Sequence, residues 1–147
     1  MFSRQCFCCI EKGKVSRHFI AVVMVVVIAS CVSQHAVREE FEESLRGYNE
    51  LRCRHETFMA SHYVKESLIE KYLSMVSTSK DVRIVGYRIL STAYDEVRGE
   101  AGAQVEIEYY SVSTQKVKTL LDTQQWVYIK EKGKGQWMLV SLPPEFK

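Results

Sequence analysis

Hydrophobic residues recur with a helical period in the first half of this chain and with a period of two in the second half. The first helical face consists of residues at intervals of four, three and three: Phe41, Leu45, Tyr48 and Leu51. Such spacing predicts an amphipathic helix that begins near Arg38. The residues from 55 to 63 interrupt the period, and Leu68, Tyr72 and Met75 resume it. The sequence therefore predicts two or three helical segments before residue 80.

After Lys80, apolar and polar residues alternate as they do in half-buried β-strands. Val105, Ile107 and Tyr109 fall on one face of such a strand, and the residues between them are polar or acidic. Further strands are expected at 82–94, 114–130 and 136–142, with a turn at 131–135. Pro143-Pro144 is expected to close the sheet, because proline cannot donate a ladder hydrogen bond.

Short connections between these runs predict antiparallel pairing. A turn centred near Val112 would place Glu108 opposite Lys116 and Glu106 opposite Lys118, which indicates a solvated sheet face. Helices followed by four strands predict an α+β domain over residues 38–147, with the helices packed on one face of a curved antiparallel sheet.

This order of elements, together with the strand sequences VEIEYY, QQWVYIK and GQWMLVS, resembles the nuclear-transport-factor-2-like fold, which is cystatin-like in outline. The resemblance covers residues 36–142 and implies a cone that can hold a ligand. Some members of that superfamily, such as ketosteroid isomerase and polyketide cyclases, are enzymes that need a buried acid or base in an apolar pocket. The possible cavity residues here are Tyr72, Tyr109, Asp122 and Trp126.

None of these residues is assigned a catalytic role. Asp122 shares a strand face with Lys118 and Trp126, where simple exposure to solvent would explain it equally well. Cys53 lies between two arginines that could lower its pKa, although a small apolar residue at a helix edge is the commoner explanation. No nucleophile elbow, phosphate-binding loop or dinucleotide fingerprint occurs, and no cofactor is expected.

The N-terminal segment has a different character. Residues 19–33 carry no charge over 15 positions, which is short for a transmembrane helix of about 20 residues. Residues 1–30 contain four Lys or Arg against Glu11, a net charge of +3, so the remainder of this +2 chain carries −1. A basic region followed by an apolar one and then by small residues is typical of a secretory signal.

The end of the apolar run is more specific. Ile28-Ala29-Ser30-Cys31 resembles the bacterial lipobox, an aliphatic residue and two small residues before a cysteine. The resemblance implies cleavage between Ser30 and Cys31 and a diacylglyceryl group on the Cys31 thiol. Residues 1–30 would then be a signal peptide and residues 31–37 a lipidated tether. Val32 follows the cysteine, which favours the outer membrane, facing the periplasm, if the host is Gram-negative.

The remaining composition narrows the choice of partners only a little. A net charge of +2 on 147 residues gives no strong attraction to nucleic acid. The cysteines of the CFCC cluster (Cys6, Cys8 and Cys9) lack a second ligand pair at zinc spacing, so no metal site is expected. The partners that remain are membrane lipid, through acylated Cys31, and an envelope protein or a small apolar ligand.

The sequence therefore predicts a lipid-anchored protein of the cell envelope whose α+β domain binds a ligand or partner without catalysis. Two alternatives remain open: an anchored enzyme of the isomerase or cyclase type, or a protein held by an uncleaved single-span anchor. A structural subunit that stacks through the exposed face of its sheet is a further possibility.

Lipidation is tested by replacing the acceptor thiol. Cys31→Ser should leave an uncleaved precursor and abolish metabolic labelling with palmitate, because only the thiol can form the thioether. Electrophoretic mobility and label incorporation in membranes report both effects. Unchanged processing of the variant would show that Cys31 has no such role.

Overall fold

The computed structural model describes the backbone of residues 17–131 and 133–146, and the side chains of residues 35–130 and 133–146. The chain divides into two compact units, Met1–Ser33 and Gln34–Lys147, and the fold given below is that of the second. Its helical elements are α1 (Arg17–Cys53), α2 (Thr57–Ser61), the 3-10 helix η1 (Glu66–Leu68) and α3 (Ile69–Thr78). Its strands are β1 (Val82–Asp95), β2 (Glu100–Ser111), β3 (Val117–Glu131) and β4 (Lys134–Leu139).

The N-terminal predictions fall largely outside this description. Residues 17–33 are helical in backbone as the first part of α1, but the side chains of Ser30 and Cys31 are not among those described. Cleavage and lipidation at this position therefore stay predictions. In the part of the chain whose side chains are described, no helix is both long enough and apolar enough to cross a membrane.

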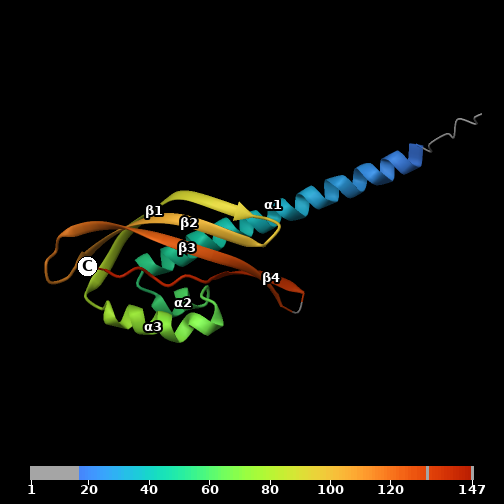
Figure 1. The fold of residues 1–147 in the computed structure, drawn as a ribbon. Helices are drawn as coiled ribbons and strands as arrows, with labels where there is room; N and C mark the ends of the chain where they lie inside the picture. Colours follow the sequence, from blue (N-terminus) through green and yellow to red (C-terminus); the bar gives the residue numbers. More distant parts are fainter. Residues whose placement is uncertain (1–16, 132, 147) are drawn as a thin grey trace, which may run out of the picture. The chain divides into compact units, whose positions relative to one another are not determined.

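The α+β class is confirmed: helices precede a single open sheet in which β1, β2, β3 and β4 are neighbours in sequence order and pair antiparallel. Figure 1 shows this meander with the helices along one side of it. Burial alternates strictly along β2, where Val105, Ile107 and Tyr109 face the helices as predicted. One face of the sheet is therefore covered and the other is open to solvent.

Aromatic rings fill the space between α1 and the sheet. The ring of Phe41 lies 5.2 Å from that of Trp137 and 6.1 Å from that of Trp126, measured between centroids. Tyr48, about two turns further along α1, packs edge-on against Trp126 at 5.7 Å. Of the predicted helix face, Phe41, Leu45 and Tyr48 are fully buried, and Leu51 is partly buried against the same core, so the periodicity identified the core side of α1 correctly.

The end of α1 is set by a Schellman motif without glycine. The amide of Glu56 donates to the carbonyl of Leu51 at 2.9 Å, and that of His55 donates to Arg52 at 3.1 Å. His55 takes the left-handed conformation, with φ of 62°, that this motif requires. The chain then turns into the short helix α2, which confirms the break expected at 55–63.

The predicted register between β2 and β3 is wrong. Glu108 lies opposite Thr119, not Lys116, and Glu106 lies opposite Leu121, not Lys118. The cause is a longer turn: the Ser111 carbonyl accepts the amides of Thr114 and Gln115, so the connection runs to Lys116. Glu106 instead pairs with Arg88 of the neighbouring strand β1, at 2.8 Å.

The last strand also differs from its prediction. It begins at Lys134, inside the expected turn at 131–135, and ends at Leu139, so 140–142 are not strand. Its outer edge is covered, because Leu139 exchanges backbone hydrogen bonds with Tyr63 and Lys65. Pro143-Pro144 therefore does not close the sheet directly but leads the chain back over the helices' side, where Phe146 packs on Tyr109 at 4.9 Å between ring centroids.

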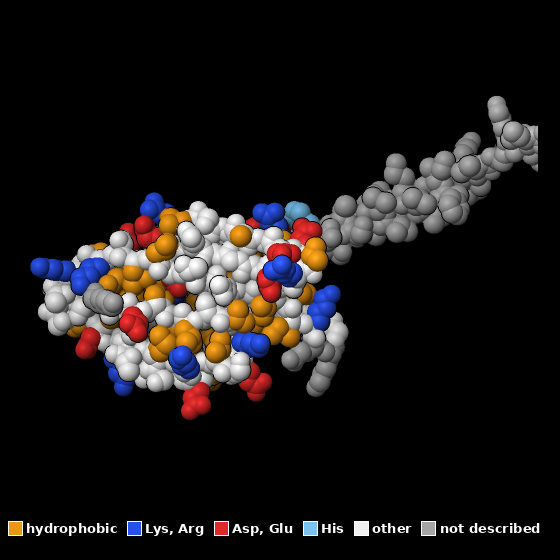
Figure 2. Space-filling view, in the orientation of Figure 1, with side chains coloured by type: hydrophobic (Ala, Val, Ile, Leu, Met, Phe, Trp, Pro, Cys, Tyr) orange, Lys and Arg blue, Asp and Glu red, His pale blue; other side chains and the backbone are white. Residues whose placement is uncertain are grey.

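Charged side chains of both signs are scattered over the face of the domain shown in Figure 2, with apolar side chains between them. On the open sheet face, exposed Val117 and Leu121 alternate with exposed Thr119 and Thr123. This surface carries no continuous apolar strip along β3.

The second unit has its own core, so it should fold alone. A truncated chain lacking residues 1–35 is expected to be soluble and to unfold in urea in one cooperative step, with tryptophan fluorescence and far-ultraviolet circular dichroism giving the same midpoint. It keeps the Val37 carbonyl, which accepts the indole N–H of Trp137 at 2.9 Å. Aggregation, or two separate transitions, would contradict a single independent domain.

Candidate functional site

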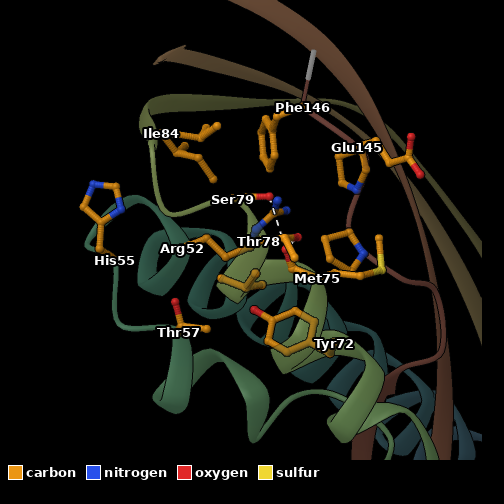
Figure 3. Close-up of a pocket in the computed structure, with 14 residues that line it drawn as sticks. Arg52, His55, Thr57, Tyr72, Met75, Thr78, Ser79, Ile84, Glu145 and Phe146 are labelled. Carbon is orange, nitrogen blue, oxygen red and sulfur yellow. Dashed lines mark hydrogen bonds between the residues drawn. The ribbon is translucent and has the colours of Figure 1, made fainter. Parts of the chain in front are cut away.

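A pocket of about 350 Å³ opens between the C-terminal end of α1, helix α3, the start of β1 and the C-terminal tail. Figure 3 shows Arg52 and the hydroxyl end of Tyr72 directed into it, with Ile84 and Phe146 across from them. The pocket is lined by Arg52, His55, Thr57, Tyr72, Met75, Val76, Thr78, Ser79, Val82, Ile84, Pro143, Pro144, Glu145 and Phe146. Its wall is about equally polar and apolar, and the most buried charged side chain in it is that of Arg52.

Arg52 forms a buried ion pair with Asp122 of β3. Its Nη1 donates to Asp122 Oδ2 at 2.7 Å, and only 6% and 4% of the two side chains are exposed. The guanidinium carbon also lies 5.4 Å from the centroid of the Tyr48 ring, a cation–π distance. Burial by itself would lower the pKa of Arg52, but Tyr48 and Asp122 outweigh that effect and hold the pKa above its ordinary value. The group is therefore always charged.

Two buried amides complete the surroundings of the carboxylate. Gln124 Nε2 donates to Asp122 Oδ2 at 3.0 Å and to Asn49 Oδ1 at 2.9 Å. Asn49 Nδ2 in turn donates to the Leu45 carbonyl at 2.8 Å. This network connects one turn of α1 to the middle of β3, and it satisfies polar groups that would be costly to bury alone.

Two tyrosines lie beside this network: the ring of Tyr48 contacts Arg52, and Tyr72 lines the pocket. Tyr48 is fully buried and Tyr72 almost so, with ring centroids 6.4 Å apart. Burial raises the pKa of both hydroxyls, more strongly for Tyr48, and the charge of Arg52 only partly opposes this. Both rings are therefore neutral at pH 7, and Tyr72 offers a hydrogen-bonding hydroxyl to the pocket.

The mouth of the pocket continues into a second groove of about 440 Å³ that adds Lys80 and Arg83 to the shared lining. Arg83 donates to the Lys80 carbonyl at 2.6 Å, which fixes its place beside the mouth. His55 stands at the rim, where partial burial and then Arg83 lower the pKa of its imidazole. At pH 7 this imidazole is neutral.

The predicted cavity residues have different positions. Tyr72 lines the pocket, whereas Asp122 is buried, is paired with Arg52 and is not part of the wall. The interpretation of Asp122 as merely exposed is therefore wrong. Tyr109 is buried and does not line the pocket, but its ring packs against that of Phe146, which does. Trp126 is a core residue that borders a separate, shallow groove of about 430 Å³ at the opposite end of the strands.

Sequence reasoning missed Arg52, which it considered as one of the two arginines beside Cys53 and not as a buried residue. A signal was present, because Arg52 continues the buried face of Tyr48 by four residues. It also missed Gln124, although Asp122, Gln124 and Trp126 alternate on one strand face and all three are buried. The C-terminal tail had no signal, since nothing in its sequence indicates where it returns.

The other candidates from the sequence were a reactive thiol at Cys53 and a metal site. Burial raises the pKa of Cys53 more than Arg52 lowers it, so the arginines do not make this thiol reactive. Among the described side chains, no three His, Cys, Asp or Glu residues are grouped so as to hold a metal ion. Cys6, Cys8 and Cys9 lie outside the described residues.

No protein-family model matches this chain, and neither a curated protein nor a solved structure matches it significantly. Functional inference therefore depends on the pocket and on the N-terminal sequence.

The buried pair can be tested through stability. Asp122→Ala leaves the Arg52 charge buried without a partner and should lower the free energy of unfolding by about 3–5 kcal/mol. The double variant Arg52→Met/Asp122→Leu, which removes both charges and keeps apolar volume, should lie close to the unchanged protein. Urea denaturation measures both.

A surface pair provides the matched control. Glu106→Gln removes the partner of Arg88, whose side chain is 71% exposed, and should cost less than about 1 kcal/mol. A loss from Asp122→Ala no larger than this control would show that the pair is not effectively buried.

Proposed function

We propose that this protein is a lipid-anchored, non-catalytic component of the cell envelope whose domain binds a small ligand. The observation that carries the ligand-binding proposal is the pocket itself. It has a volume within the range of about 300–1,000 Å³ for ligand sites, and its wall combines apolar side chains with about as much polar surface, to which the buried Arg52 and Tyr72 contribute. The lipobox-like sequence ending in Cys31 supports the anchor, which would hold the domain close to the membrane surface.

We further propose that the domain is nuclear-transport-factor-2-like. Supporting this is the order of elements, with helices before a four-stranded antiparallel meander, and a pocket between the helices and the start of that sheet. A ligand entering this pocket would contact α3 and the C-terminal tail before it reached Arg52.

An enzyme of the isomerase or cyclase type fits the pocket less well. A general base must come within about 3 Å of the proton that it removes. Asp122 is the buried carboxylate nearest to the pocket, but its Oδ2 already accepts Arg52 and Gln124. Because Arg52 lines the pocket and Asp122 does not, a substrate in the pocket would meet the guanidinium and not the carboxylate.

Stacking through the open sheet face is also less favoured. Interfaces of that kind need a contiguous apolar patch, and polar threonines interrupt the exposed apolar residues of β3. An uncleaved anchor in place of the lipid would leave the pocket and its proposed role unchanged. The processing of the Cys31→Ser variant separates those two ways of attachment.

Filling the pocket tests the proposal. Thr78 and Ser74 are both exposed positions on α3, but only Thr78 lines the pocket. Thr78→Trp should abolish co-purification of a small molecule with the full-length protein from membranes, whereas Ser74→Trp should retain it. Mass spectrometry of extracts from equal amounts of protein gives the comparison.

Two results would contradict ligand binding in this pocket. One is that no small molecule accompanies the unchanged protein at a ratio near one to one. The other is that Thr78→Trp and Ser74→Trp carry the same molecule in the same amount while both variants unfold at the normal urea concentration.

A further inference from the structure

We infer that the ligand of this pocket is a small organic carboxylate with an apolar body, and that Arg52 binds its carboxylate group. The inference depends on the proposed ligand-binding function and specifies its chemistry. It starts from the unusual place of Arg52, a permanently charged side chain that is 94% buried and yet forms part of a pocket wall.

The Arg52 guanidinium has N–H donors that Asp122 does not engage. It carries five N–H groups in a planar fork, and the carboxylate of Asp122 engages one of its nitrogens, Nη1. Among the described residues, no second carboxylate is bonded to it. Arg52 and Tyr72 both line the pocket, and Figure 3 shows the end of the Arg52 side chain and the Tyr72 hydroxyl on its wall. A bound carboxylate would accept from this fork and from Tyr72.

Asp122 acts here as a positioning residue. It does not line the pocket itself, and it holds the guanidinium in place together with the ring of Tyr48. Gln124 shares the same carboxylate oxygen and fixes its direction. An arginine that is already oriented loses little side-chain entropy when a ligand binds.

The charges around the opening favour an anion as well. The pocket and its adjoining groove are lined by three cations, Arg52, Lys80 and Arg83, and by one carboxylate, Glu145. Glu145 is exposed to solvent, where its charge is well screened, while Arg52 is not. The neutral imidazole of His55 at the rim adds no charge at pH 7.

The apolar side chains that line the pocket indicate that the rest of the ligand is apolar. Val76, Ile84 and Phe146 offer apolar contact, with the two prolines completing that side. Free inorganic phosphate would leave these surfaces unused, and a cation would be repelled by Arg52. A neutral ligand would leave buried guanidinium donors without an acceptor, which is costly. An apolar body that ends in a carboxylate satisfies both parts of the pocket.

The test compares two probes of nearly equal shape, 2-naphthoate and its uncharged amide, 2-naphthamide. Isothermal titration of the full-length protein in detergent, with protein-free micelles titrated as the blank, gives both affinities. The unchanged protein is expected to bind 2-naphthoate at least about tenfold more tightly than 2-naphthamide, as for a charge-assisted hydrogen bond in a buried site.

Two variants assign the preference to Arg52. The double variant Arg52→Met/Asp122→Leu should still unfold cooperatively and should bind 2-naphthoate no more tightly than 2-naphthamide. Arg52→Lys keeps the charge without the planar fork and should reduce the ratio of the two affinities about tenfold.

The outcomes separate this inference from the function on which it depends. Equal binding of the two probes by the unchanged protein would overturn the carboxylate and leave a ligand pocket. A preference for 2-naphthoate that survives in both variants would overturn the role of Arg52. If neither probe binds to the unchanged protein, the ligand-binding function itself fails.

Discussion

The ion pair between Arg52 and Asp122 is the interaction on which the arrangement of this domain depends. It joins the last turn of α1 to the middle of β3, and both charges are buried. Neither charge is tolerable there without the other, because desolvation of a single ion costs several kcal/mol. The helix can therefore slide or rotate on the sheet only by breaking the pair, and Asn49 and Gln124 add a second connection one turn earlier. Aromatic packing supplies most of the driving force, but these polar contacts fix which packing is adopted.

The pocket follows from the same constraint. A guanidinium cannot be sealed entirely beneath apolar side chains, and the structure leaves one side of Arg52 facing a space lined by α3, β1 and the tail. The Schellman motif at His55 ends α1 directly after this residue, so no further helical turn covers it. The tail then returns through Pro143-Pro144 to place Phe146 against Tyr109 and complete the apolar wall. The motif that ends the helix and the tail that follows the last strand therefore both shape the cavity.

The parts of this structure that could be predicted were those governed by local repetition. The helix face of Phe41, Leu45 and Tyr48 and the alternation of Val105, Ile107 and Tyr109 both matched the buried surfaces, since spacing along an element decides which side chains share a face. The register of β2 on β3 was not predictable in this way. A turn centred at Val112 was expected, but the connection after Ser111 is longer and shifts the pairing. A three-residue change in that turn gave Glu106 a different partner, Arg88 on the other neighbouring strand.

The sequence by itself determined the α+β class, the inward faces of its helices and strands, and the lipobox-like pattern at Cys31, because each depends on residues close together in the chain. Only the tertiary structure decided the site. Arg52 and Asp122 are 70 positions apart, and each alone looks like an ordinary surface charge. Their burial, their pairing and the placement of Phe146 over the same space depend on how α1, β3 and the tail meet. Such contacts are set by packing among distant segments, which no local pattern of residues records.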